Sequence, residues 1–564
     1  MTARQLLGQI LKEMKLIHEG HIQDALTEQR TSGGAIGEML VKMELISRED
    51  LAKALGIQAG MEVIDLASLD VPADVIAKID ATTASLLRVM PCRLEGNVLT
   101  VALADPLNAS ALDELHFLSG CDVKGAIADG EAIEKALEKY YGTDHLNQGM
   151  GNAVNELKAQ AASGGLDLED KNAMAHAAPV VKLLNFILYQ AIRDRASDVH
   201  LEPFATEFKV RYRVDGVLYE MDPPPVALAI PLISRVKVMS NLDIAETRVP
   251  QDGRIELAIG GKPVDLRVST LPTVHGESCV MRVLDRSVVQ LDLENIGLRG
   301  EELLTIRKLG KLPNGIVLVT GPTGSGKTTT LYSVLQEVNS PESKIVTTED
   351  PVEYDLDGIV QVPISEEIGV TYAKCLRTIL RQDPDIILVG EIRDRETAQI
   401  AVEAALTGHL VFSTLHTNDA PSAVMRLVDI GVEPFLIGAT LEAVVAQRLV
   451  RKICRDCKEL YDPDPELLRE IDLDPESVGD KQFSFGKGCE NCNYSGFKGR
   501  IAIFEMMHVS ERIKNAVIDR ESSTQLRGLA IEEGMRPLRE SALLAIFDGL
   551  TTVEEVLRET VVER

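Results

Sequence analysis

The sequence predicts a multidomain α/β protein whose C-terminal part, from about residue 296, is a parallel, doubly wound sheet. Three observations support this fold class. The chain of 564 residues exceeds the length of one ordinary domain. An apolar run, Ile316–Thr320, leads into a glycine-rich loop and then a helical pattern. Strand-like and helix-like segments then alternate, as they do when parallel strands are joined by crossover helices.

The first 60 residues contain a repeat with an offset of 29 positions, and each unit is predicted to form two short helices. Ser47 and Asp50 form a predicted capping pair for one of these helices. The repeated positions are Gly8, Leu11, Leu16, Ile17, Ile22, Ala25, Leu26 and Gln29, which recur as Gly37, Leu40, Leu45, Ile46, Leu51, Ala54, Leu55 and Gln58.

We expect four parts along the chain. Residues 1–141 form an N-terminal docking or regulatory module, in which 61–141 are mixed α/β. Residues 142–177, rich in Gly, Asn, Ala and acids, form a flexible linker. Residues 178–290 form a second α/β domain, and 296–564 form the domain around the glycine-rich loop. The last part includes a cysteine-bearing insertion at 450–500 and a helical tail at 510–564, with Thr551 as a helix cap.

A charged strand is predicted in the second domain, followed by a hairpin turn at Asp215-Gly216. Its alternation places three cations on one face, which indicates either an anion-binding surface or a solvated strand face. The buried positions are Phe208, Val210 and Tyr212, and the cations are Lys209, Arg211 and Arg213.

Composition restricts the partners. The chain has 59 basic and 87 acidic residues, a net charge of −28, no Trp and few other aromatic residues. This balance argues against a broad nucleic-acid groove, which needs a positive field and stacking platforms. The sequence has no apolar run of transmembrane length and no signal-peptide pattern. We therefore expect a cytoplasmic protein that reaches a membrane only through partners.

The glycine-rich loop is the strongest functional signal in the chain. It fits the pattern G-x-x-x-x-G-K-[ST], in which main-chain N–H groups wrap phosphate oxygens at a helix N-terminus. The pattern predicts an ATP site, with the lysine at the β- and γ-phosphates and the threonine at Mg²⁺. The residues are Gly321, Pro322, Thr323, Gly324, Ser325, Gly326, Lys327 and Thr328.

Two further strand ends carry carboxylates, and hydrolysis needs such groups to hold a metal ion and position water. The apolar run 386–389 is followed by Gly390 and Glu391, which has the form of a second nucleotide motif with Glu391 at Mg²⁺. A second acidic strand end lies at 345–353 and includes Glu349 and Glu353. A carboxylate there could orient or deprotonate the attacking water, or belong to an ordinary acidic loop.

Two histidines, His409 and His416, lie seven residues apart downstream. Either imidazole could sense the γ-phosphate by donating a hydrogen bond, but for each histidine taken alone a structural role is favoured.

Eight cysteines divide into two groups. Four are isolated and read as small core residues, namely Cys92, Cys121, Cys279 and Cys375. The other four form two C-x-x-C pairs separated by a 31-residue spacer, namely Cys454, Cys457, Cys489 and Cys492. Two such pairs predict a structural zinc site with four thiolate ligands, and a redox dithiol or iron–sulfur cluster is the alternative.

From about residue 178 to the C-terminus the chain resembles the secretion ATPase superfamily, specifically the assembly motors of bacterial type II secretion and type IV pili. The strings that carry the resemblance are ASDVHLEP at 196–203, RYRVDGVL at 211–218, RVPQDGR at 248–254, VTTEDPVEY at 346–354, LRQDPDIILVGEIRD at 380–394 and TGHLVFSTLHTNDAP at 407–421.

The resemblance implies a RecA-like ATPase domain preceded by a smaller, PAS-like α/β domain, in a homohexamer with ATP between subunits. By match to the family's motifs, Glu349 is the catalytic carboxylate with Glu353 in support, Glu391 is the Walker B acid, and His409 and His416 form the histidine box. Arg213, Arg248 and Arg254 match arginines that reach phosphates from the same or a neighbouring subunit. Arg377 and Arg381 either complete the site or pair with acids. The cysteine insertion is common in assembly motors and absent from the similar retraction motors, which favours assembly.

The N-terminal repeat also resembles modules of these motors, some of which bind cyclic di-GMP through paired RLGxxLxxxGxI motifs. This chain has Lys15 and Glu44 where the motif has glycine, and Leu6 where it has arginine. A structural role, or docking to an inner-membrane platform protein, is therefore favoured over cyclic di-GMP binding.

Taken with the resemblance, the sequence predicts a cytoplasmic ATPase that powers assembly of pseudopili or pili and uses ATP, Mg²⁺ and Zn²⁺. Two alternatives stay open, a DNA-uptake or DNA-translocating ATPase and a nucleotide-gated cyclic di-GMP receptor. The charge and the scarcity of aromatic residues count against the first.

Overall fold

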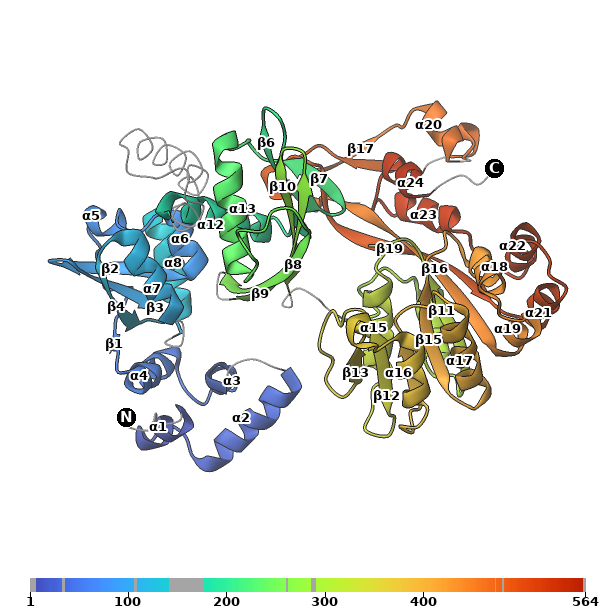
Figure 1. The fold of residues 1–564 in the computed structure, drawn as a ribbon, viewed down its shortest axis with the longest axis horizontal. Helices are drawn as coiled ribbons and strands as arrows, with labels where there is room; N and C mark the ends of the chain where they lie inside the picture. The colour runs from blue at the N-terminus through green and yellow to red at the C-terminus, as the bar shows by residue number, and fades with distance from the viewer. Residues whose placement is uncertain are drawn as a thin grey trace. The chain divides into compact units, whose positions relative to one another are not determined.

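The computed structural model describes residues 7–32, 36–105, 109–141, 177–259, 262–285, 291–471, 473–478 and 481–560 (Figure 1). Nearly all of the predicted linker, 142–176, lies outside these ranges. The chain divides into two compact units, residues 1–288 and 289–564, and each is described by itself.

Four helices at the N-terminus confirm the repeat: α1 (Leu7–Glu13), α2 (Glu19–Ser32), α3 (Ile36–Lys42) and α4 (Arg48–Ala59). They share one apolar core. Equivalent glycines allow the same close contact in both units, because a Cβ at Gly8 would lie 3.0 Å from Ile22 and one at Gly37 would lie 2.6 Å from Leu51. The predicted capping box of Ser47 and Asp50 is present at the start of α4.

Residues 61–141 form the predicted mixed α/β segment. Its four-stranded sheet has the order β1-β4-β3-β2, with β3 and β4 parallel and β2 antiparallel to β3. Helices cover this sheet around a buried core. The elements are β1 (Glu62–Val63), α5 (Ala73–Ile76), α6 (Ala81–Leu87), β2 (Val89–Glu95), β3 (Val98–Leu103), α7 (Ala109–Ser119), β4 (Asp122–Ile127) and α8 (Gly130–Tyr141).

The second domain is a six-stranded antiparallel sheet of order β7-β6-β5-β10-β9-β8, covered by α12 and α13. The predicted alternation in β6 is confirmed, because Phe208, Val210 and Tyr212 are buried in the core. Its elements are α12 (Ala178–Arg193), β5 (Asp198–Pro203), β6 (Phe208–Val214), β7 (Val217–Glu220), η1 (Val226–Leu228), α13 (Ala229–Met239), β8 (Gln251–Ile259), β9 (Lys262–Thr273) and β10 (Gly276–Asp285).

The C-terminal unit contains the predicted doubly wound sheet, with the order β13-β12-β14-β15-β11-β16-β19. All neighbours are parallel except the edge strand β19, which is antiparallel to β16. Separate apolar cores lie on its two faces. The elements are α14 (Gly300–Leu309), β11 (Gly315–Thr320), α15 (Lys327–Val338), β12 (Ile345–Glu349), β13 (Val360–Pro363), η2 (Glu366–Ile368), α16 (Tyr372–Ile379), β14 (Ile386–Val389), α17 (Arg395–Leu406), β15 (Leu410–Leu415), α18 (Ala420–Ile430) and α19 (Pro434–Thr440).

Strands β16 (Leu441–Ile453) and β19 (Phe497–His508) extend beyond this core as a long ribbon toward a small hairpin (Figure 1). The hairpin and the tail are made of η3 (Arg455–Cys457), β17 (Lys458–Tyr461), α20 (Pro465–Glu470), η4 (Pro475–Ser477), β18 (Phe483–Gly486), η5 (Glu490–Cys492), α21 (Glu511–Ile518), α22 (Ser523–Glu532), α23 (Leu538–Phe547) and α24 (Val553–Glu559). The predicted cap Thr551 is wrong by one residue, because the hydroxyl of Thr552 accepts from the main chain of Glu555 at the start of α24.

Candidate nucleotide site and cysteine cluster

Four parallel strands end together at one edge of the seven-stranded sheet. Thr320 of β11 pairs with Leu415 of β15, and Val389 of β14 pairs with both Ser413 of β15 and Thr348 of β12. The segments that follow these strands therefore meet, and we call them the nucleotide edge. They are the phosphate loop, His416, Gly390 with Glu391, and Glu349 with Asp350.

The phosphate loop joins β11 to α15, as predicted. Gly324 and Gly326 have φ values of 80° and 88°, a region that favours glycine. A Cβ at Gly321 would lie 2.5 Å from the main-chain oxygen of Gln447, and one at Gly326 would lie 2.8 Å from its side-chain nitrogen. Gln447 of β16 therefore backs the loop and leaves no room for side chains at these two glycines.

Lys327 begins α15 and is 9% exposed. Its Nζ donates to the main-chain oxygens of Gly321 and Pro322, at 2.8 and 3.0 Å. Burial lowers the pKa of Lys327 to about 8, and the nearby charge of Glu391 opposes this shift. The buried hydroxyl of Ser325, which has no hydrogen-bond partner among the described residues, adjoins Gly321. Such a donor suits a ligand oxygen.

Thr328, the second residue of α15, is exposed at the helix N-terminus. Its hydroxyl is the group that the motif assigns to Mg²⁺.

Glu391 lies at the nucleotide edge and is 8% exposed. One carboxylate oxygen is 2.6 Å from Nη2 of Arg393, and the other is 3.3 Å from Nε2 of His416. Gly390 before it is required, because a Cβ there would lie 2.8 Å from the main-chain oxygen of Thr348. The acid is thus held between a guanidinium and an imidazole, near Lys327.

Glu349 is the last residue of β12. It is buried, with only 5% of its surface exposed. The carboxylate accepts hydrogen bonds from Tyr332 of α15, from Thr347 at 2.5 Å and from Gln361 of β13 at 3.0 Å. Adjacent strands lie about 4.8 Å apart, so β12, three strands from β11, lies roughly 14 Å from the strand that carries the phosphate loop.

The two histidines occupy opposite ends of β15. His416 follows the strand at the nucleotide edge, with its side chain half exposed. His409 precedes the strand, and its Nδ1 lies 2.9 Å from the main-chain oxygen of Ala404 and 3.1 Å from the Thr407 hydroxyl. The structure therefore does not bring His409 to the nucleotide edge of its own chain. The strand between the two residues separates them, and the seven-residue spacing did not reveal this.

Arg377 and Arg381 lie at and just beyond the end of α16, and both have partners away from the phosphate loop. Arg377 is 2.6 Å from Glu396, and Arg381 donates to the main-chain oxygen of Arg377.

The three arginines matched in the other unit are each held by an acid. Arg213 is 3.7 Å from Asp198 and donates to the main-chain oxygen of Gly216 at 3.0 Å. Arg254 is 2.6 Å from Asp265.

Arg248 forms a two-pronged pair with Glu246, at 2.7 and 3.0 Å, and its side chain is 86% exposed. The pair lowers the pKa of Glu246 to about 2.

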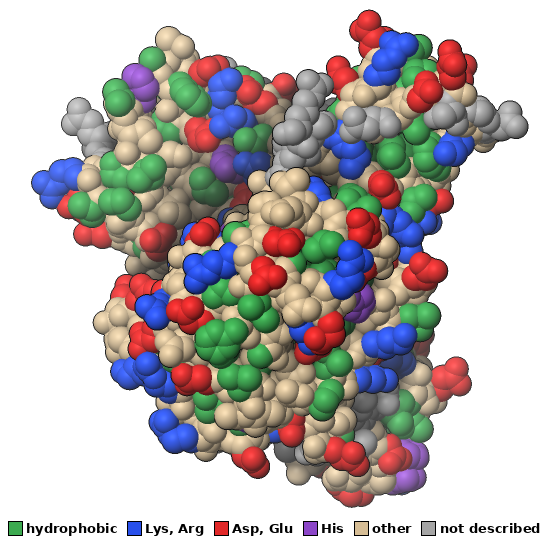
Figure 2. Space-filling model, turned by 90° about the vertical axis from the view of Figure 1, so that its right-hand side faces the viewer, with side chains coloured by type: hydrophobic (Ala, Val, Ile, Leu, Met, Phe, Trp, Pro, Cys, Tyr) green, Lys and Arg blue, Asp and Glu red, His purple; other side chains and the backbone are tan. Residues whose placement is uncertain are grey.

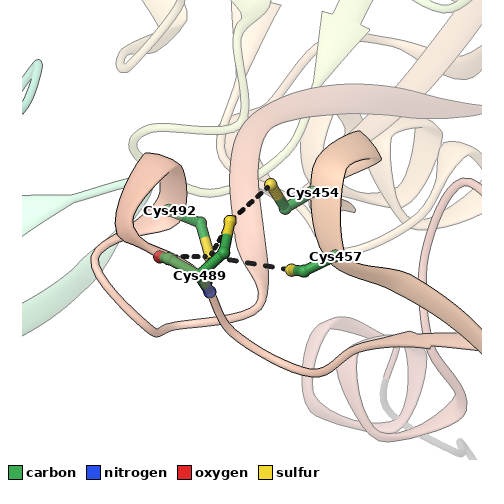
Figure 3. A group of neighbouring side chains, drawn as sticks. All are labelled: Cys454, Cys457, Cys489 and Cys492. Carbon is green, nitrogen blue, oxygen red and sulfur yellow. Dashed lines mark hydrogen bonds between the residues drawn. The ribbon is translucent and has the colours of Figure 1, made fainter.

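The four paired cysteines come together at the end of the β16–β19 ribbon (Figure 3). Their sulfur atoms all lie within 4.8 Å of one another, and three of the separations are 3.8 Å. A tetrahedron of sulfurs about 2.3 Å from zinc has edges of about 3.8 Å, whereas a disulfide bond is about 2.05 Å long. The arrangement fits a tetrahedral metal ion and confirms the predicted grouping.

Main-chain groups support this cysteine cluster. The N–H of Gly488 donates to the sulfur of Cys457 at 3.3 Å, and that of Cys489 donates to the sulfur of Cys492 at 3.2 Å. These contacts stabilise thiolates. The spacer leaves through β17 and returns through β18, which pair as an antiparallel hairpin.

Three of the isolated cysteines, Cys92, Cys121 and Cys279, are buried as predicted, and burial raises the pKa of Cys279 to about 12. Cys375 differs, because it is only partly buried, on α16.

On the face shown in Figure 2, Lys and Arg side chains are interspersed with Asp and Glu. Among the described helices, none combines the length and apolar character needed to span a bilayer.

Sequence reasoning singled out His416, a partner of Glu391, but missed the other partners of the two acids. Arg393 lies two residues beyond Glu391, in a string already singled out, so its position was the available signal. Tyr332, Gln361 and Gln447 carry no local signal, because only the packing of α15 and the order of the strands brings them to the site.

Comparison with known proteins agrees with this geometry. A family model described as "Type II/IV secretion system protein" matches residues 173–558, more than half of the chain, and an MshEN domain model matches residues 59–146. The chain is 44% identical to the type IV pilus assembly ATPase PilB of Myxococcus xanthus, over 99% of both chains. It is 40% identical to the type II secretion system protein E of Xanthomonas campestris, again over 99% of both.

A solved structure, the ATPase DotB of Legionella pneumophila, is similar in fold to 66% of this chain and 94% of its own, with a TM-score of 0.51 and 21% identity. The chain therefore belongs to the type II/IV secretion system protein family, the family of the type II secretion and type IV pilus assembly ATPases.

Proposed function

We propose that this protein is a hexameric motor whose ATP hydrolysis powers assembly of type II secretion pseudopili or type IV pili. The observation that carries the proposal is the nucleotide edge. There the phosphate loop, Glu391 and His416 follow parallel strands that end at the same level of the sheet. The full-length similarity to a pilus assembly ATPase and a type II secretion protein supports pilus or pseudopilus assembly as the process that the motor drives.

The groups of the nucleotide edge have separate roles in this proposal. The loop N–H groups and Lys327 bind the triphosphate, and the Thr328 hydroxyl and Glu391 hold Mg²⁺, which neutralises phosphate charge when bound. His416 donates to the γ-phosphate from the side of Glu391. Glu349 orients the attacking water and accepts its proton.

His409 has no role at this edge in its own chain, because it lies at the other end of β15.

Arginines complete the charge balance. Around the phosphate loop, the described basic side chains include Lys327, Arg393 and Arg448 of β16. Arg393 is engaged by Glu391, and Arg448 donates to Asn418. A triphosphate therefore calls for further cations, which Arg213, Arg248 and Arg254 of the antiparallel domain supply, from the same or a neighbouring subunit. Arg248 is the most exposed of the three and exchanges Glu246 for phosphate oxygens.

The motor acts from the cytoplasm on an inner-membrane platform protein. In this proposal, binding and hydrolysis of ATP shift the domain at 178–290 against that at 296–564, and this rigid-body cycle is passed to the platform.

The cysteine cluster is a structural zinc site in this proposal. The site has four closely spaced sulfurs, and main-chain N–H groups donate to two of them. Such a closed set of four ligands is typical of structural rather than catalytic zinc. The metal ties the start of β17 to the segment that leads into β19.

A second candidate function is cyclic di-GMP binding by the N-terminal part, which the MshEN match favours. The turns of the two repeat units have the same left-handed backbone conformation. Lys15 and Glu44, which stand where the family pattern has glycine, have φ values of 58° and 57°. The charge of Glu44 opposes phosphate binding. Isothermal titration calorimetry of the full chain with cyclic di-GMP tests this function. Measurable binding, with a higher affinity in Glu44→Gly, would support it.

The motor is tested with the purified full chain, by light scattering and by steady-state hydrolysis of Mg²⁺–ATP. We expect a hexamer with slow turnover that Glu349→Gln and Glu391→Gln both abolish. A monomer that binds ATP without turnover would contradict the motor. Stimulation of turnover by DNA would instead support the DNA-translocating alternative.

A further inference from the structure

Glu349 has an unusual set of partners for a buried acid. Tyr332 donates to one carboxylate oxygen, and Thr347 and Gln361 donate to the other at 2.5 and 3.0 Å. Among the described residues, no Lys or Arg forms an ion pair with it. Three neutral donors therefore hold the carboxylate in place.

The donor side of Gln361 is fixed by its other contacts. Its Oε1 accepts from the main-chain N–H of Leu356 at 2.8 Å, while its Nε2 also donates to the main-chain oxygen of Tyr354 at 3.0 Å. The opposite amide orientation would break both contacts and turn an oxygen toward the carboxylate. Gln361 is thus built to donate to Glu349.

Tyr332 is fully buried and links Glu349 to the phosphate loop. It lies on α15, the helix that begins in the loop at Lys327, five residues earlier and about 7.5 Å along the axis. Any movement of α15 when phosphates bind therefore reaches the hydrogen bond between Tyr332 and Glu349.

The titratable groups around Glu349 come from three sides. Tyr332 faces it from α15 and Tyr372 from α16, while Asp350 follows it in the chain. Glu391 and Arg393, beyond β14, also act on Tyr372. Burial raises the pKa of both tyrosines well above the usual range, so both hydroxyls remain donors at neutral pH.

We propose that Tyr332, Thr347 and Gln361 are positioning residues that aim the Glu349 carboxylate for hydrolysis. The inference rests on the proposed function, in which Glu349 receives the proton of the attacking water. Hydrogen bonds from neutral donors fix the direction of a carboxylate, whereas a fixed cation would also oppose proton uptake strongly. Neutral donors therefore suit an acid that must point at the attacking water and accept its proton.

The test is steady-state ATP hydrolysis by the full chain carrying Tyr332→Phe, with kcat and KM measured separately. Loss of one donor leaves the Glu349 carboxylate less well aimed, so we expect kcat to fall by about tenfold. The KM for ATP stays within about twofold, since the variant leaves Lys327 and the loop glycines unchanged. Thr347→Val lowers kcat in the same way.

Tyr141→Phe is the matched control, because it removes another buried tyrosine hydroxyl, one that donates to the main-chain oxygens of Ile76 and Ile79. It should leave kcat unchanged. A wild-type kcat in both Tyr332→Phe and Thr347→Val, with Glu349→Gln inactive, would overturn this inference alone. Wild-type turnover in Glu349→Gln would overturn the proposed role of Glu349 itself. If Tyr332→Phe fails to fold, Thr347→Val and Gln361→Leu decide the question.

Discussion

The nucleotide edge and the cysteine cluster share strand β16 but are held together by different forces. At the edge, Gln447 of β16 backs the phosphate loop, and hydrogen bonds and ion pairs hold the acids in place. At the end of the same strand, four cysteines gather with sulfurs within 4.8 Å. The first region is preformed by the register of a sheet, and in the proposed function a metal ion holds the like ligands of the second together.

This difference predicts different responses to removal of one group. When a side chain is removed from a site that strand register positions, the site loses catalytic activity but keeps its fold. A site set by a metal loses its local fold, because binding free energy of the metal is folding free energy for that segment.

The largest expected effect is therefore on the structure of the cysteine cluster. Cys454→Ser should reduce bound zinc from one equivalent to a small fraction, since zinc contributes on the order of 10 kcal/mol in small zinc-dependent folds. Metal analysis and limited proteolysis of the β17–β18 hairpin would measure this. Cys375→Ser, which removes an isolated thiol, should change neither. Full zinc content in Cys454→Ser would show that the cluster is not a four-ligand zinc site.

The second effect separates the two ends of strand β15. His416→Gln, at the nucleotide edge, should lower kcat by on the order of 100-fold, the usual cost of losing one positioned donor. His409→Gln, at the opposite end, should change kcat by less than about threefold. Steady-state ATP hydrolysis measures both. Equal losses in the two variants would contradict the separation of the histidines.

The smallest effect concerns the pH dependence of stability at the nucleotide edge. The pKa of Lys327 is about 8 in the folded chain, below its ordinary value in the unfolded chain. Between these values the unfolded state binds the extra proton, so the free energy of unfolding rises with pH, by at most about 1.4 kcal/mol per pH unit. The melting temperature relative to Lys327→Met should therefore rise from pH 8 to pH 10. A difference that stays constant would mean that Lys327 is protonated throughout.

Sequence patterns predicted residues that are close together in the chain, but not partners that only the fold brings together. The grouping of the four cysteines was predicted correctly, because metal ligation restricts both the residue type and the local spacing. The phosphate loop was predicted with equal success, since its glycines and lysine are contiguous. The partners of Glu349 were not, because Tyr332 and Gln361 reach it only through helix packing and strand order.

Spacing alone did not place two residues. His409 lies at the end of β15 opposite the nucleotide edge of its own chain, because the strand ends could not be placed from the seven-residue spacing. The cap at Thr551 belongs to Thr552, because two adjacent threonines offer the same chemistry and only the main-chain geometry distinguishes them.

The central claim is that the nucleotide edge hydrolyses ATP, and Lys327→Ala tests it most directly. Hydrolysis of Mg²⁺–ATP by the variant should be measured beside the wild type, with light scattering to confirm that the assembly is retained. The account predicts an intact hexamer without measurable turnover. A folded variant that keeps wild-type turnover would contradict the assignment of the site.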